Sequence, residues 1–347
     1  MNELQPIKYK KAYEDIISKQ ITVWMWSNIF KECFDILKND TIMNDSSILR
    51  DAIIRGILRY ENGAFYSNTH VGIKIAQELD SIGAKYSKSK KCWIISKDKL
   101  PSNVLWAIET VKAKTYAKVQ AIKGFLDFQL AHLNQIIGKI TFDTAVKAIM
   151  ADLQKRVYAN AKKHRIELIT PKLDDFTSNE IAKNYTNNLD FWIKDWTEEQ
   201  IIRMREVVGK MSIDGQSVKT IEDYLIKEFG VAQRKARFLA RNESAIASTS
   251  YLVSKYQAEG FTTFKWHTNI DGRERPLHKQ LNGQIFRFDN PPIIDERTGE
   301  RGLPSQTYNC RCSFSPIPHK EWLENRKKMF KAQNSFTSKL KRFFKVA

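Results

Sequence analysis

Most of the chain shows the hydrophobic spacing of helices. Apolar residues recur at steps of three and four along 21–39 and again along 142–166, as they do on one face of a helix. Few helix-breaking residues interrupt the stretch from 103 to 163. The pattern therefore predicts a mainly α fold for the first two thirds of the chain.

Local start and stop signals divide the later helical region. Thr177 and Thr197 each precede a Glu or Gln by three positions, a spacing that is typical of a capping box at a helix start. The sequence Asp-Gly-Gln-Ser at 214–217 predicts a turn. Gly230 and Gly260 predict helix ends, because glycine adopts the backbone conformation that closes a helix. Several consecutive helices are therefore expected between 177 and 260.

A short segment near residues 70–100 has a different pattern. A helix is expected to end near Gly83, and two short strands flank the polar, lysine-rich turn at 87–91. Cys92 lies in the second strand beside apolar neighbours, which favours a packed thiol. The sequence predicts a small, basic α/β hairpin element here.

Beyond Gly260 the hydrophobic pattern alternates as in strands. Segments 261–268 and 284–288 each predict a strand, and a short helix or loop is expected around His278. Segment 307–314, "TYNCRCSF", alternates in the same way and predicts a third strand. The fold class expected for the whole chain is mainly α with a C-terminal α+β module.

The predicted strand at 307–314 has a chemical consequence. Alternate strand residues point to the same face, so Cys310 and Cys312 would project together and Arg311 would project oppositely. Neighbouring thiols in that arrangement do not readily form a disulfide with each other.

The patterns divide the chain into an N-terminal region with the basic hairpin (1–102), a helical middle region (103–215), the α+β module (216–318) and a basic, aromatic tail (319–347).

Charge adds a class of partner to this picture. The 347 residues carry 57 Lys+Arg against 39 Asp+Glu, a formal net charge of +18. A basic surface favours polyanions, because binding releases counterions from phosphates without reading base sequence. The chain has no apolar run long enough to span a membrane, no secretory signal is expected, and the four scattered cysteines predict a reducing compartment.

The C-terminal residues resemble a known family. A helix carrying "LARNESAIASTSYLVSKYQAEGF", then "KWHTNIDGRERPLHKQLNGQIF" and finally "NCRC" follow one another in order. This order resembles the phage Mu F-like minor head, or head morphogenesis, proteins. The residues that match the pattern of that family are Ala240, Arg241, Glu243, Trp266, Asp271, Arg273, Arg275, His278, Gly283, Cys310, Arg311 and Cys312.

The resemblance implies a structural protein of a tailed bacteriophage rather than an enzyme. Such a protein would act inside the capsid at the portal vertex, after assembly in the host cytoplasm, and would aid head assembly and DNA packaging or delivery. The implied partners are the portal protein, packaged double-stranded DNA, and a scaffolding or major capsid protein.

The cysteines and His278 also allow a metal hypothesis. Zinc takes four nitrogen, sulfur or oxygen ligands, and Cys310, Cys312 and His278 would supply three, with His267 or Asp271 as the fourth. The alternative is that both cysteines pack as small apolar residues while His278 hydrogen-bonds Asp271. Sequence patterns leave both open.

Two further hypotheses concern the same residues. Arg273, Arg275 and Arg311 could bind phosphate through their guanidinium groups. For Arg273 and Arg275 the internal role is favoured, because irregular chain leaves many carbonyls in need of donors. The alternative to a structural role is an enzyme. It would be a metal-dependent nuclease using His267, Asp271, His278 and Asn309, or an acyl-transfer enzyme in which Cys310 or Cys312 is the nucleophile and His278 its base. The sequence shows no recognisable nuclease motif in its support.

The tail beyond Pro318 is the other candidate for DNA contact. Nine Lys+Arg stand against two Asp+Glu from 320 to 347, interleaved with aromatic residues, a composition that can hold phosphates and add apolar anchoring. A docking helix is the alternative. The candidate DNA-binding residues are Lys327, Lys328, Lys331, Lys339, Lys341, Arg342 and Lys345.

Overall fold

The structure, a computed structural model, is mainly helical with small antiparallel sheets, which confirms the expected fold class. It describes residues 4–39, 47–67, 70–138, 140, 142–166, 168, 173–318, 322–325 and 328. Within these ranges, every helix is too short or too polar to cross a bilayer.

The helices occupy most of the described chain. They are α1 (Lys11–Met25), which runs through a π-helical turn (Trp26–Phe30) into α2 (Lys31–Lys38), α3 (Ile48–Ile54), α4 (Ile73–Ser81), a 3₁₀ turn (Lys97–Lys99), α5 (Ser102–Ala131), α6 (Leu133–Ile137), α7 (Asp143–Lys163), α8 (Asp175–Ile213), α9 (Val218–Ala258) and α10 (Pro276–Leu281). The strands are β1 (Arg59–Glu61), β2 (Ala64–Tyr66), β3 (Lys85–Ser87), β4 (Cys92–Ile94), β5 (Thr263–His267), β6 (Ile285–Arg287), β7 (Ile293–Asp295), β8 (Glu300–Arg301) and β9 (Ser313–Ile317).

Contacts group the chain into two compact units, each built from separated segments. Unit 1 comprises Met1–Ile21, Ile140–Trp192 and Lys235–Ala347, and unit 2 comprises Thr22–Lys139 and Ile193–Arg234. Sequence patterns had divided the chain into consecutive segments instead. The difference arises because α1, α8 and α9 each contribute residues to both units.

The two longest helices correct the predicted helix boundaries. The residue that caps the start of α8 is Asp174 and not Thr177. Asp174 Oδ1 accepts a hydrogen bond from the Thr177 N–H at 2.8 Å. Thr197 lies buried within α8, and Gly230 lies within α9. A helical glycine costs only about 1 kcal/mol, which packing along a long helix outweighs. The predicted turn at 214–217 does separate α8 from α9, with Gly215 at φ +72°.

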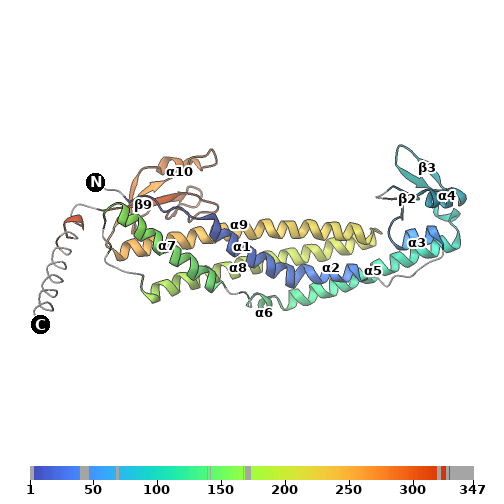
Figure 1. Ribbon diagram of the computed structural model, residues 1–347, viewed down its shortest axis with the longest axis horizontal. Coiled ribbons are helices and arrows are strands. Elements are labelled where there is room, and N and C mark those ends of the chain that lie inside the picture. The colour runs from blue at the N-terminus through green and yellow to red at the C-terminus, as the bar shows by residue number, and fades with distance from the viewer. Residues whose placement is uncertain are drawn as a thin grey trace, which may run out of the picture. The chain divides into compact units, whose positions relative to one another are not determined.

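Unit 2 contains the predicted hairpin element. Helix α4 ends just before Gly83, whose φ is +85°, and β3 and β4 pair with Ser87 opposite Cys92, so both expectations for this segment are confirmed. The hairpin belongs to a four-stranded antiparallel sheet of order β1-β2-β4-β3. Figure 1 shows α3, α4 and these strands at one end of α5. Phe65 is fully buried in their shared apolar core.

Unit 1 contains the C-terminal module. Strand β5 lies at the centre of a three-stranded antiparallel sheet of order β6-β5-β9, with α10 between β5 and β6 in the chain (Figure 1). Phe264, Trp266 and Phe314 pack in the core with Tyr256 of α9. The strands expected at 261–268 and 284–288 and the short helix around His278 are confirmed.

Candidate metal centre

The candidate centre forms where α10 meets the chain that enters β9. Pro276 occupies the first turn of α10, where its fixed φ and missing N–H are tolerated. The short helix then directs His278 inward, and His278 is 2% exposed. Cys310 and Cys312 are also buried and reach the same point from the other side.

The two cysteines do not lie in a strand, which corrects the sequence prediction for 307–314. Strand β9 begins only at Ser313, and the preceding chain turns at Asn309, whose φ is +57°. The Asn309 N–H donates to Asn242 Oδ1 of α9 at 3.1 Å, and the Ser305 hydroxyl donates to the Cys312 carbonyl at 2.8 Å. These side-chain bonds, not strand pairing, fix the cysteine loop.

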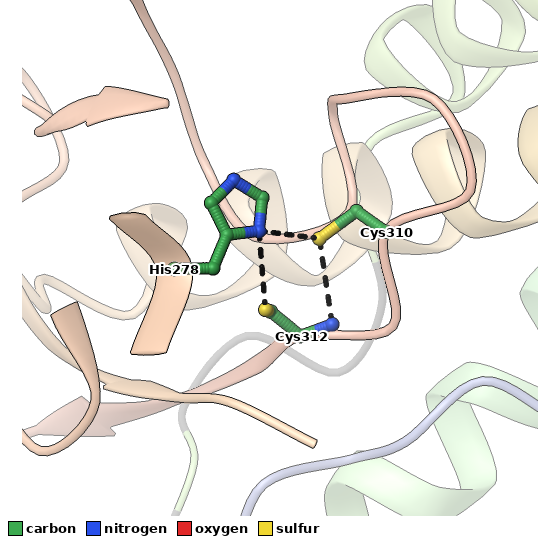
Figure 2. Close-up of side chains that lie close together, drawn as sticks. All are labelled: His278, Cys310 and Cys312. Carbon is green, nitrogen blue, oxygen red and sulfur yellow. Dashed lines mark hydrogen bonds between the residues drawn. The ribbon is translucent and has the colours of Figure 1, made fainter. Parts of the chain in front are cut away.

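Both sulfur atoms nevertheless face the histidine, as Figure 2 shows. The distance from His278 Nδ1 is 3.5 Å to Cys310 Sγ and 3.6 Å to Cys312 Sγ. The other ring nitrogen, Nε2, lies 3.1 Å from the Ile294 carbonyl. Because a carbonyl only accepts hydrogen bonds, Nε2 carries a proton, and in the neutral imidazole the Nδ1 lone pair points at the sulfurs.

The residues expected as a fourth ligand have other partners. His267 Nε2 lies 2.7 Å from Ser315 Oγ on the neighbouring strand β9. Asp271 is bound by Arg311 through both guanidinium nitrogens, with Arg311 Nη2 2.8 Å from Asp271 Oδ1. Among the described residues, the metal-ligand cluster therefore contains only His278, Cys310 and Cys312. The expected hydrogen bond between His278 and Asp271 is likewise replaced by the bond to Ile294.

Charges around the cysteines favour one thiolate. The hydrogen bond from Cys312 lowers the pKa of Cys310, against the opposing effect of burial. The hydrogen bond to Cys310 and burial raise the pKa of Cys312. Two anionic sulfurs on these residues would repel each other, and a cation between them would offset that repulsion.

The arginines of the matching pattern contact neighbouring protein groups. Arg273 pairs with Asp271 at 3.3 Å. Arg275 donates to Thr307 Oγ1 at 3.0 Å and to the Tyr308 carbonyl at 2.7 Å. Arg275 and Arg311 therefore connect the chain before α10 to the cysteine loop from two sides.

The matching residues on α9 form further contacts within unit 1. Arg241 forms a two-pronged ion pair with Glu14 of α1, with both nitrogen–oxygen distances at 3.0 Å. Glu243 is 2% exposed and accepts a hydrogen bond from Asn242, and burial raises the pKa of its carboxyl group. Asn242 is the residue that also binds the cysteine loop. Sequence analysis missed its role because its partner is a backbone N–H.

Trp266 and Gly283 have structural positions. Trp266 is fully buried, donates to Thr268 Oγ1 at 3.1 Å and lies edge-on to His278 with ring centroids 5.5 Å apart. Gly283 has a φ of +80° directly after α10, a conformation that glycine adopts without strain. Its N–H bonds the Trp266 carbonyl at 2.8 Å, which returns the chain to β5.

The cluster borders a small cavity. Its volume is about 160 Å³, and His278, both cysteines, Thr268, Glu274 and Asn309 contribute to its wall. Of the tail residues expected to bind DNA, Lys328 is exposed. The remaining six, Lys327, Lys331, Lys339, Lys341, Arg342 and Lys345, lie outside the described residues.

Comparison with known proteins identifies the module. Residues 204–315 match the family described as Phage Mu protein F like protein, so this segment is similar to that family. A stretch of 126 residues, 36% of this chain, is 25% identical to an uncharacterized protein of Haemophilus influenzae and spans 27% of that protein's length. No solved structure matches the chain.

Proposed function

We propose that this chain is a minor head protein of a tailed bacteriophage that docks at the portal inside the capsid. The observation that carries the proposal is the family match at 204–315. The protein would aid head assembly through protein contacts and would touch packaged DNA without reading its sequence. A scaffolding or major capsid protein would be a further protein partner during head assembly.

The contacts of the matching residues support a structural role. Arg241 pairs with Glu14, Arg275 with Thr307, and Arg311 with Asp271. Trp266 is fully buried. Residues engaged in internal contacts of this kind hold a fold together.

The nuclease alternative needs His267 and Asp271 beside His278, whereas each has a different partner. Purified protein is therefore expected to leave plasmid DNA uncut with Mg²⁺, Mn²⁺ or Zn²⁺.

Pull-down with the portal protein tests the docking proposal. The tagged chain is co-expressed with the portal protein encoded by the same phage, and the retained complex is measured by size-exclusion chromatography with light scattering. A stable complex is expected. A chain that remains unbound across a range of salt concentrations contradicts portal docking, even where the module is folded.

The basic hairpin supports the DNA contact. Lys88, Lys90 and Lys91 are exposed on the turn between β3 and β4, beside the exposed Tyr86, whose ring packs against Trp93. Lysines next to an exposed aromatic ring can bind phosphates and add an apolar contact. A net charge of +18 strengthens such binding at any DNA sequence.

Fluorescence anisotropy with labelled duplex DNA tests this contact. Replacing Lys88, Lys90 and Lys91 by Gln is expected to weaken binding and to reduce the slope of log K against log salt by up to about 3, since each phosphate contact contributes about 0.9. The matched control replaces Lys155, Lys162 and Lys163, exposed lysines of α7, and removes the same net charge. Equal effects of both triple variants, or preference for one base sequence, would contradict the hairpin as the contact.

A further inference from the structure

We propose that the module binds one zinc ion through His278 Nδ1, Cys310 Sγ and Cys312 Sγ, with water from the adjoining cavity as the fourth ligand. The three ligand atoms lie within 4.8 Å of one another. The proposal goes beyond the structural role above, because it assigns a metal to the junction of α10 and the cysteine loop.

The spacing of the ligand atoms fits a tetrahedral ion. Zinc binds sulfur at about 2.3 Å and nitrogen at about 2.0–2.1 Å, so tetrahedral angles place a sulfur and a nitrogen about 3.6 Å apart. The two nitrogen–sulfur distances are 3.5 and 3.6 Å. Both edges of the tetrahedron that include the histidine already have the length that zinc requires.

The histidine is held in the form that binds a metal. Its Nε2–H donates to the Ile294 carbonyl, which fixes the plane of the ring and makes Nδ1 the nitrogen with the free lone pair in the neutral imidazole. A hydrogen bond from the second ring nitrogen to a carbonyl or carboxylate is the usual support of a zinc-bound histidine. The alternative is that both cysteines only pack as small apolar residues. Packing of that kind does not require a histidine nitrogen directed at both sulfurs.

A neighbouring donor suits a bound thiolate. The Cys312 N–H points at Cys310 Sγ at 3.5 Å. Both cysteines are buried, so two thiolates there need a cation, and zinc supplies two positive charges where they are required. Arg311 cannot take that place, because its guanidinium is bound to Asp271.

The fourth position opens to the cavity. Its 160 Å³ is several times the roughly 30 Å³ that one water occupies in the liquid, and Thr268, Glu274 and Asn309 offer polar groups on its wall. His267 and Asp271 have other partners, so a water ligand completes the four-coordinate site. The ion would then crosslink α10 to the chain that enters β9, two segments about thirty residues apart in sequence.

Metal analysis of the full chain, purified under reducing conditions, tests the proposal. One equivalent of zinc per chain is expected, and replacement by Co²⁺ should produce the intense absorption of tetrahedral cobalt thiolate. Cys310→Ser, Cys312→Ser and His278→Ala are expected to lose the metal. Cys33→Ser and Cys92→Ser are matched controls, since these buried thiols lie outside the cluster, and both should keep it.

A second measurement keeps the test decisive where a variant fails to fold. Wild-type protein is stripped with a chelator, titrated with Co²⁺ and then exposed to azide. A folded, reduced wild type that binds neither zinc nor Co²⁺ overturns the site and leaves packed thiols. A cobalt spectrum that azide does not change overturns the open fourth position. Neither result affects the portal or DNA measurements, so failure here is distinguishable from failure of the proposed function.

Discussion

The two small sheets of this protein have cores of different chemistry. In the N-terminal sheet region, residues 47–111, every described residue that is buried is apolar. In the C-terminal module, residues 240–318, the apolar core is interleaved with buried polar residues. They are Asn242, Glu243, Ser244, Ser248, Thr249, Lys255, Glu259, His278, Ser305 and Ser315.

The two cores place different constraints on their sequences. An apolar core accepts many residues of similar volume, since the hydrophobic effect has no direction. Buried polar groups accept only partners at the right distance and angle, and each group left unpaired carries a desolvation penalty. The C-terminal module is therefore expected to tolerate substitution less well than the N-terminal sheet region. The matching residues of the family lie where this constraint is strongest.

The largest effect is expected from the buried ion pair of α9. Lys255 Nζ lies 3.1 Å from Glu259 Oε1, and both side chains are fully buried. Lys255→Met would leave the Glu259 carboxylate without its charged partner in the core. Breaking such a pair from one side costs about 3–5 kcal/mol of unfolding free energy. Urea denaturation of wild type and variant measures the difference.

Two matched variants sharpen this test. Lys219→Met removes the shared partner of Asp223 and Glu222 at the start of α9, where Lys219 and Asp223 are exposed and a loss of at most about 1 kcal/mol is expected. The double variant Lys255→Met with Glu259→Leu removes both buried charges and should be more stable than Lys255→Met alone. A loss below about 1 kcal/mol for Lys255→Met would show that the buried pair contributes little to the module.

A smaller effect is expected at Gly302, which lies close to Ile294, the residue whose carbonyl binds His278. A methyl group on Gly302 would collide with Ile294 Cδ1 and approach Gln306 Oε1 to 2.8 Å. Gly302→Ala is therefore expected to cost about 1–3 kcal/mol, the usual range for overpacking. It should also shift Ile294, whose carbonyl orients His278. Thermal unfolding measures the first effect, and the NMR signals of the His278 ring report the second.

The control is the helical glycine of α9 in unit 2. A methyl group on Gly230 meets only the flexible end of Arg234, at 3.6 Å. Gly230→Ala should therefore stabilise the protein by about 0.5–1 kcal/mol, because alanine is the better helix former. Destabilisation by both variants would indicate that the Gly302 effect is unspecific.

The same comparison explains how much of the fold could be predicted. Hydrophobic alternation and a turn signal located the β3–β4 hairpin, β5 and β6, because each alternating segment buries one face. The cysteine loop was mistaken for a strand because Cys-Arg-Cys also alternates between apolar and polar residues. Its turn at Asn309 depends on Asn242, 67 residues earlier, which no local pattern reveals.

The candidate site was predictable only in part. His278, Cys310 and Cys312 were identified from their residue types, and the structure brings them together. The role of the Ile294 carbonyl could not be predicted, because every residue carries such a group and only the fold selects one. His267 and Asp271 are suitable ligand types, but both have other partners in the fold. His267 hydrogen-bonds Ser315 on the neighbouring strand, and Asp271, in an exposed loop, accepts hydrogen bonds from Arg311.

The smallest effect is expected from that partly exposed pair. Hydrogen bonds from Arg311 hold the pKa of Asp271 at about 2, below the ordinary 3.8. Because the pKa is lower in the folded state, the stabilising contribution is complete above about pH 4. It is lost as the pH falls from about 4 toward 2, when the carboxylate is protonated. Asp271→Asn should therefore lower stability at pH 6 and show no further loss from this group at pH 3.

Urea midpoints at pH 6, 4 and 3 measure this dependence. The difference between wild type and Asp271→Asn should shrink as the pH falls. Asp289→Asn is the matched control, since Asp289 pairs with Arg287 but is 62% exposed, against 29% for Asp271. Water and salt screen the more exposed pair more strongly, so its pH-dependent difference should be smaller. A difference for Asp271→Asn that stays constant from pH 6 to 3 would mean that the carboxylate charge does not hold the α10 loop to the cysteine loop.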